Sequence, residues 1–275
     1  MNDYSINGQS LSAYGISATR TGGTSLALFS AWDLPARTGD TFYDWKDTDG
    51  TEAYVDADDM LFGPRNLMFT GLISAGNGKT IGERITAFTS FLDTVNKGMF
   101  TLSAEWGSWE VQQSSSVSLK RLDNNHAEFS ISLTEPRPDL SGTIPAPTGR
   151  GDDIDGYAWE ELGLYIASVS GALDVPGRKE IDTTRAEGDS TLTYGGLESR
   201  KIAISGTLIA DNYTQFVSRV RALYVLFAGS GLRTYKYRGN TYRCFAPDGF
   251  TVRDVVVSNK TIASWNITLR TANNG

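Results

Sequence analysis

Few side chains in this 275-residue sequence could carry out chemistry. It has one histidine, His126, at the start of the alternating run HAEFSISLTE, and one cysteine, Cys244, in the aromatic run YRCFAP. Every serine or cysteine triad of the histidine type would need His126, and no GxSxG elbow precedes it. We therefore predict a partly buried or edge histidine and a small buried cysteine. A single cysteine allows no intrachain disulfide, which suits a reducing compartment.

The segment GNGKT, residues 76–80, follows a strand-like run and opens a helical pattern, the setting in which a P-loop holds phosphate. The full pattern requires glycine at position 73, where the sequence has Ile73. The corresponding place in the second half reads ADNYTQ, without Gly-Lys. We therefore predict an ordinary connection between a strand and a helix, and no nucleotide site at Lys79.

The segment DWKDTDGTEAYVDADD, residues 44–59, contains six aspartates and a glutamate. With Gly50 as the central glycine of an EF-hand, Asp47 and Asp49 take ligand positions, but Trp45 takes the first and Asp56 the last. We expect a solvated acidic hairpin, with looser calcium coordination as the alternative. A glycosidase pair of carboxylates stays open, because their separations are unknown. We predict no catalytic, cofactor-binding or metal-binding residues, and no enzyme activity.

Composition limits the partners of the chain. The net charge of −7 and the pI near 4.8 argue against a general phosphate-binding surface. The start, MNDYSINGQSL, lacks a basic region followed by an apolar one, and no window approaches 18 apolar residues. The sequence therefore predicts a soluble protein made in a cytoplasm, with neither an export signal nor a membrane span.

Four segments of the first half return in the second half in the same order. LPARTG (34–39) matches VPGRKE (175–180) at an offset of 141. RNLMFTGLI (65–73) matches RKIAISGTL (200–208) at 135, and the helical stripe of Ile81, Ile85, Phe88 and Leu92 matches Phe216, Val220, Leu223 and Phe227 at 135. HAEFSISLTE (126–135) matches IASWNITLRT (262–271) at 136, which indicates a duplicated unit.

The repeat predicts a mainly β fold of two tandem β-sandwich or barrel-like domains, each with one amphipathic helix. Thr80 with Glu83 and Asn212 with Gln215 have the chemistry of helix N-caps, and glycines near 98 and 229–231 are expected to end the helices in a left-handed conformation. The segment 135–156 is rich in Pro, Gly, Ser and Asp. We predict a first domain over 1–134, a linker over 135–156 and a second domain over 157–275.

The second half resembles the ring-forming domain of siphophage distal tail proteins, which are related to tube and baseplate hub proteins. The resemblance covers SGALDVPGRKEID (170–182), RKIAISGTLIADNYTQFVSRVRALYVLF (200–227), GLRTYKYRGNTYRC (231–244) and IASWNITLRTA (262–272). The first half follows it more loosely, with its added acidic loop. Typical distal tail proteins have one ring domain and form six-chain rings, whereas tandem ring domains are a feature of hub proteins whose trimers mimic a hexamer. The trimer and the hexamer both stay open.

The resemblance implies a structural protein of the virion tail, assembled in the host cytoplasm. Its partners would be further copies of itself in a ring, the tail tube protein, and tail tip or receptor-binding proteins, with DNA only as passing cargo and no membrane. The alternative is a carbohydrate-binding or adhesion protein of two β-sandwich modules. The aromatic run TYKYRGNTYRC (234–244) could form a sugar platform, but its alternation favours cross-strand pairs.

Overall fold

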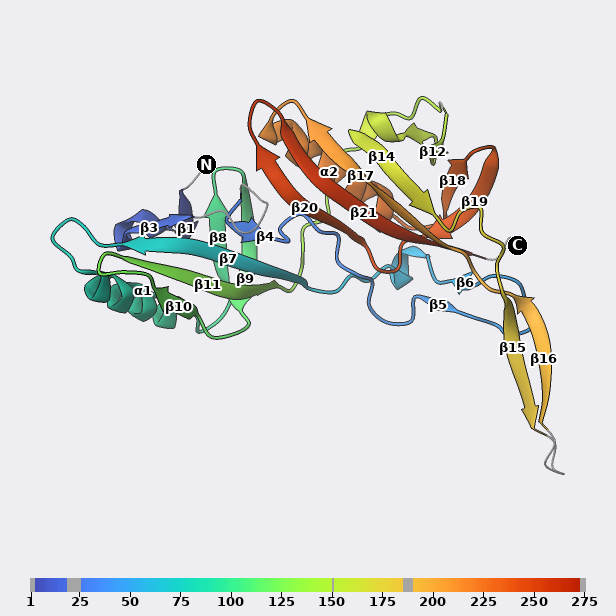
Figure 1. Cartoon of the computed structure of the whole chain (residues 1–275), viewed down its shortest axis with the longest axis horizontal. Helices are drawn as coiled ribbons and strands as arrows, with labels where there is room; N and C mark the ends of the chain where they lie inside the picture. The colour runs from blue at the N-terminus through green and yellow to red at the C-terminus, as the bar shows by residue number, and fades with distance from the viewer. Residues whose placement is uncertain (1–2, 19–25, 150, 185–189, 273–275) are drawn as a thin grey trace.

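The structure, a computed structural model, describes residues 3–18, 26–149, 151–184 and 190–272. Most of its described strands form two large curled antiparallel sheets that lie side by side, and one long helix accompanies each of them (Figure 1). Two further strand pairs form separate hairpins. The fold is mainly β, with two tandem β-sandwich domains, as the repeat predicts. Neither described helix combines the length and apolar character needed to cross a bilayer.

The first sheet has the strand order β2-β1-β8-β9-β11-β7-β3, and β10 and β4 pair with β11 and β7. Its strands are β1 (Tyr4–Ile6), β2 (Gln9–Ser10), β3 (Ile16–Ala18), β4 (Leu28–Phe29), β7 (Arg65–Ser74), β8 (Phe100–Ala104), β9 (Gly107–Gln113), β10 (Ser118–Arg121) and β11 (His126–Glu135). A 3-10 turn η1 (Leu11–Tyr14) precedes β3, and helix α1 (Ile81–Val95) follows β7.

The second sheet has the order β13-β12-β18-β19-β21-β17-β14, and β20 pairs with β21. Its strands are β12 (Asp153–Ile154), β13 (Tyr157–Ala158), β14 (Leu164–Ser170), β17 (Lys201–Ala210), β18 (Arg233–Tyr237), β19 (Asn240–Phe245), β20 (Phe250–Val257) and β21 (Thr261–Thr271). A 3-10 turn η3 (Trp159–Leu162) precedes β14, and helix α2 (Tyr213–Ala228) follows β17. Apart from β4, each strand of the first sheet has a counterpart here.

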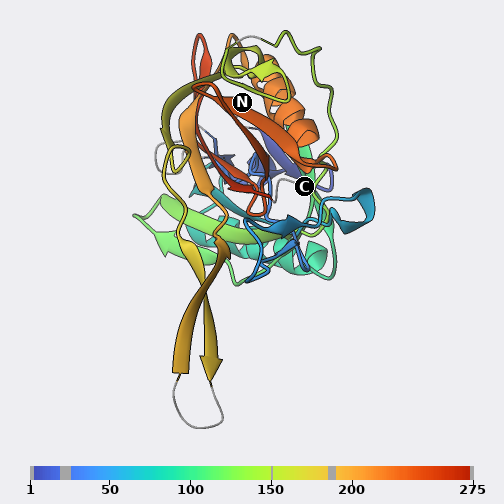
Figure 2. The ribbon, with the colours of Figure 1, turned by 90° about the vertical axis from the view of Figure 1, so that its right-hand side faces the viewer.

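Two hairpins occupy the same place in the two halves, before β7 and before β17. In the first half it is β5 (Phe42–Tyr43) with β6 (Glu52–Ala53), followed by the 3-10 turn η2 (Ala57–Asp59). In the second half it is the longer pair β15 (Arg178–Thr184) and β16 (Ser190–Leu197), which projects away from the sheets (Figures 1 and 2).

The register of the central strands agrees with the alignment of the repeat. Phe129 of β11 lies opposite Gly71 of β7, and Trp265 of β21 lies opposite Gly206 of β17. A Cβ atom on Gly71 would come within 2.4 Å of the Phe129 ring, and one on Gly206 within 2.5 Å of the Tyr165 carbonyl oxygen. The glycine of each repeat therefore leaves room for neighbouring atoms at the same point of the sheet.

The predicted helix caps and the positions of the helix ends are confirmed, but the predicted left-handed residue at each helix end is wrong. Thr80 and Glu83 form a reciprocal capping box, and the Asn212 side chain accepts a hydrogen bond from the Gln215 amide at 2.9 Å. Gly98 has no positive φ, and Gly229 is extended at φ −68°, so only Gly231, at φ +85°, is left-handed. The chain leaves both helices through residues with negative φ, Asn96 and Gly229.

The second sheet begins inside the predicted linker. Asp153–Ile154 form β12, and Asp155 and Gly156 form a left-handed turn before β13. A two-residue strand is too short to show an apolar period, which is why the segment reads as linker. A further sequence repeat could have revealed β12 and β13. INGQSLSAYGI (6–16) matches IDGYAWEELGL (154–164) at an offset of 148.

Each helix packs on the aromatic residue at the centre of its sheet. The Phe88 ring of α1 lies 5.1 Å from the Phe129 ring, and the Phe227 ring of α2 lies 6.3 Å from the Trp265 ring. Phe129 and Trp265 are 2% and 0% exposed. Since the alternation of β11 and β21 points these side chains inward, their burial holds helix and sheet together.

Replacing Phe129 or Trp265 with Ala should therefore lower the free energy of unfolding by about 3 to 5 kcal/mol, because each change leaves a cavity in the core. Urea unfolding followed by circular dichroism measures this loss. Ile262→Ala is the matched control, since Ile262 lies on β21 and is 40% exposed. A loss below about 1 kcal/mol for either aromatic residue would contradict its role in the core.

Candidate functional site

The residues singled out for chemistry lie apart and have structural surroundings. His126 begins β11, and its Nδ1 atom lies 3.0 Å from Oδ2 of Asp123 in an exposed turn. Hydrogen bonds from the Asn125 amide and from His126 hold the pKa of Asp123 below its usual range. His126 is thus a partly exposed residue at a strand end, as predicted.

Cys244 lies on β19 and is fully buried, as predicted. Its Sγ atom lies 3.6 Å from the Arg233 carbonyl oxygen, and burial raises the pKa of the thiol to about 12. The thiolate is the reactive form of cysteine, so the side chain remains a protonated, apolar part of the core near neutral pH.

The segment GNGKT forms a tight turn and a helix start. The Gly76 and Lys79 backbones exchange two hydrogen bonds of 3.0 and 3.1 Å around Asn77 and Gly78, both left-handed. At the N-terminus of α1, the Thr80 hydroxyl accepts from the Glu83 amide, and the Glu83 carboxylate from the Thr80 amide. The capping box thus occupies donors that a phosphate would need, and the predicted strand-to-helix connection is confirmed.

The acidic loop 44–59 packs against the second half of the chain. Lys179 at the base of β15 donates hydrogen bonds to the carbonyl oxygens of Trp45, Thr48 and Gly50. The Asp49 carboxylate accepts from the Leu197 amide at 2.7 Å. Part of the predicted solvated hairpin therefore packs on the base of the β15–β16 hairpin, where its backbone oxygens accept hydrogen bonds from the buried Lys179 ammonium group.

Calcium coordination by the acidic loop, the alternative to a solvated hairpin, has no support in the described residues. Within the described residues, no group of three or more His, Cys, Asp and Glu side chains is arranged to hold a metal ion. Two of the aspartates have protein partners, since Asp44 pairs with Arg270 at 3.2 Å and Asp49 binds the Leu197 amide.

The aromatic run 234–244 forms cross-strand pairs, as predicted. Tyr235 of β18 lies opposite Tyr242 of β19, with ring centroids 6.2 Å apart. Tyr235 is fully buried, and the Tyr242 hydroxyl donates to the Ala172 carbonyl oxygen at 2.7 Å. These rings therefore do not form an open sugar platform.

The two halves meet in an extensive contact. Residues 30–37 of the first half add to the outer edge of β20, where Leu34 and Phe250 exchange backbone hydrogen bonds of 3.0 and 3.2 Å. The Arg37 amide donates to the Pro247 carbonyl oxygen at 2.8 Å. An edge strand of one domain is thus paired by a segment of the other.

An ion pair accompanies this backbone pairing. Asp33 accepts from the Arg253 guanidinium and, at 2.8 Å, from the Val252 amide. Burial raises the pKa of Asp33 above its usual range, while the hydrogen bond from Arg253 acts in the opposite direction. The charged carboxylate in this buried contact therefore depends on Arg253.

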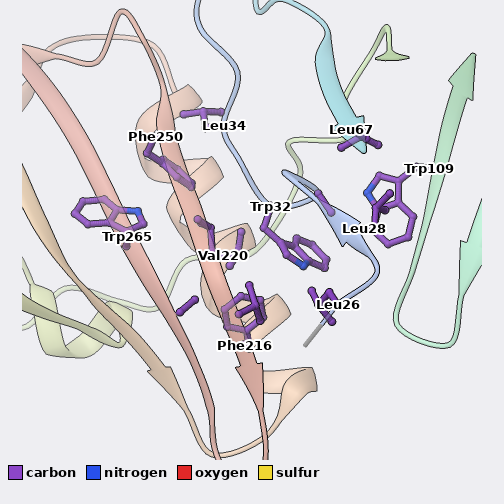
Figure 3. Close-up of a cluster of buried hydrophobic side chains, with 14 of the residues drawn as sticks. Leu26, Leu28, Trp32, Leu34, Leu67, Trp109, Phe216, Val220, Phe250 and Trp265 are labelled. Carbon is purple, nitrogen blue, oxygen red and sulfur yellow. The ribbon is translucent and has the colours of Figure 1, made fainter. Parts of the chain in front are cut away.

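Aromatic side chains fill the rest of the contact. Trp32 lies beside Phe216 and Val220 of α2, and Leu34 lies beside Phe250 (Figure 3). The Trp32 indole donates to the Tyr213 hydroxyl at 3.0 Å, and its ring meets the Phe216 ring edge-on at 6.1 Å. Trp106 lies 5.2 Å from the Tyr213 ring. Trp32 is 5% exposed, so this contact excludes water like a domain core.

No protein-family model matches the chain, and no curated protein matches it in sequence.

Replacing Trp32 with Ala should uncouple the halves, because it removes a buried ring and the hydrogen bond to Tyr213. We expect a loss of about 3 to 5 kcal/mol and a separation of unfolding into two transitions. Differential scanning calorimetry reports both effects. Met99→Ala is the control, since Met99 of the first half is 51% exposed and lies outside this contact. A single transition with unchanged midpoint in Trp32→Ala would contradict the coupling.

Cys244 should not react with a thiol reagent at pH 8 in the folded protein. Because the pKa of the Cys244 thiol is raised, the thiol stays protonated in the folded protein. It loses its proton only as the pH rises through about 12. In urea at the same pH, the thiol should react fully. Rapid labelling of the folded protein would contradict the assigned burial.

Proposed function

We propose that this chain is a structural subunit of a phage or prophage tail tip. Copies of the chain form a ring at the distal end of the tail tube and link the tube to the tip or receptor-binding proteins. The proposal includes no enzymatic activity. It rests on the resemblance of the second half to distal tail proteins, and the architecture of the chain supports it.

The observation that supports this proposal most is the kind of contact between the halves. Both halves have the same sheet order, but they meet through unlike surfaces. The first half contributes residues 30–37, and the second half contributes α2 and β20. A contact between unlike surfaces of similar units is heterologous, and such contacts build rings when the rotation closes.

Two further features agree with a structural role. The side chains singled out for chemistry, including His126, Cys244 and Lys79, lie in separate parts of the fold. The net charge of −7 suits a passage that must not retain DNA. The acidic loop 44–59 of the first half binds Lys179 and Leu197 of the second half, which is a structural role.

Native mass spectrometry of the purified chain at several concentrations, together with negative-stain electron microscopy, tests this proposal. We expect a mass of three or six chains and a ring outline with a central opening. Three chains would correspond to the tandem hub arrangement and six to the distal tail arrangement. A strict monomer that binds glycans on an array would contradict the proposal and favour the two-module adhesion protein.

A further inference from the structure

We propose that the second half binds the first half of another copy of this chain through a repeat of the intrachain contact. The binding segment is 171–178, and it pairs with the free edge of β10 beside α1. This inference deepens the proposed function, because it assigns the surfaces that would join neighbours in the ring. Its argument rests on the intrachain contact itself.

The segments 30–37 and 171–178 are equivalent in position and in anchoring. The sequence SAWDLPAR matches GALDVPGR at the offset of 141 found for the proline-arginine turn. Arg65 donates to the Ala31 carbonyl oxygen at 2.9 Å, and Arg200 donates to the Ala172 carbonyl oxygen at 2.8 Å. The paired arginines at the starts of β7 and β17 therefore hold both segments in the same way.

The two segments differ in what covers them. Trp32 and Leu34 are 5% and 2% exposed, because α2 and β20 lie over them. Their equivalents, Leu173 and Val175, are 53% and 90% exposed. Segment 30–37 forms a buried contact, whereas the equivalent segment 171–178 exposes its apolar side chains. Such exposed apolar side chains indicate that segment 171–178 also binds a protein surface.

The first half contains the equivalent of the surface that receives segment 30–37. Val252 lies opposite Trp265 and Leu119 lies opposite Phe129, so β10 corresponds to β20. By the same register, Lys120 corresponds to Arg253, and Val117, one residue before β10, corresponds to Phe250. β11 is the one described strand that pairs with β10, which leaves the outer edge of β10 open to strand addition.

Charge supports the same pairing. Asp33 pairs with Arg253 within the chain, and the equivalent residues are Asp174 and Lys120. Both are exposed, and neither forms an ion pair in the described part of the chain. Docking of segment 171–178 on β10 would bring these opposite charges together. In both contacts the segment carries the acidic residue and the strand carries the basic one.

An open groove lies where the second contact would form. In the first half, Tyr224 of α2 covers Arg65, with the guanidinium 5.4 Å from its ring. Around Arg200, whose guanidinium lies 5.7 Å from the Tyr242 ring, the equivalent site is a groove of about 660 Å³. It is bounded by β19, the base of the β15–β16 hairpin and residues 48–50 of the acidic loop. The helix of the incoming half would lie over this groove, as α2 lies over Arg65.

Cysteine cross-linking tests this contact directly. Leu34 and Phe250 form a hydrogen-bonded antiparallel pair, whose Cα atoms lie about 5.5 Å apart, a separation that suits a disulfide. We therefore expect Val175→Cys chains mixed with Val117→Cys chains to give disulfide-linked dimers under mild oxidation. The double variant should give a ladder that ends at the full ring. Each single variant alone is the control, and Cys244 is too buried to interfere.

Charge exchange provides a second test. Asp174→Lys and Lys120→Glu should each raise the concentration needed for half-assembly by about tenfold, which corresponds to about 1.4 kcal/mol. The two changes in one chain should restore assembly. Glu160→Lys on η3 is the matched control for a surface charge reversal. Thermal unfolding of all variants at a monomeric concentration should match the wild type.

The outcomes separate this contact from the ring proposal. If rings form without the mixed disulfide and their assembly is unaffected by the charge exchange, the proposed contact is wrong and the ring proposal stands. Disulfide-linked open chains without ring closure would support the contact and contradict the ring. Self-linking of Val175→Cys alone would overturn the inference, because it would show a contact between like surfaces.

Discussion

The backbone pairing of Leu34 with Phe250 is the interaction on which the arrangement of the two halves depends. It satisfies the outer edge of β20, which would otherwise expose unpaired amide and carbonyl groups. Because the pairing fixes residues 30–37, it also places Trp32 against α2 and Asp33 against Arg253. The hydrophobic and ionic parts of the contact follow from where this one strand segment lies.

The arginines at the starts of β7 and β17 explain why the same segment can act differently in the two halves. Arg65 and Arg200 each bind the carbonyl group four residues before the proline of the segment. Each segment is therefore held on its own domain, and its outer side is left available for another one. In the first half α2 and β20 cover that side, whereas Leu173 and Val175 of the second half face solvent.

The long elements of this fold could be predicted from the sequence because their signals are local. β11 and β21 alternate large apolar and polar residues over 10 and 11 residues, and α1 and α2 show stripes at helical spacing. The strands β1, β2, β12 and β13 have only two or three residues, so they show no period. Their signal was a repeated turn, Asn7-Gly8 and Asp155-Gly156, which has positive φ in both halves.

The contact between the halves could not be predicted in the same way. Trp32 is buried against α2, whose Tyr213 lies 181 residues away in sequence, whereas Leu173 is exposed. The local patterns of the two segments are nevertheless alike. The contact of loop 44–59 with Lys179 could not be predicted from the sequence either, because it uses backbone carbonyl groups that every residue has. The largest local difference is Trp32 in the first half, where the second half has Leu173.

The most direct measurement is a cryo-electron microscopy reconstruction of the assembled particle. It would compare the rotation from the first to the second half within a chain with the rotation from that second half to the first half of the next chain. Equal rotations about one axis, with all halves in one closed ring, are the expected result. Two unrelated rotations, or a particle without a central axis, would contradict the account of a duplicated ring subunit.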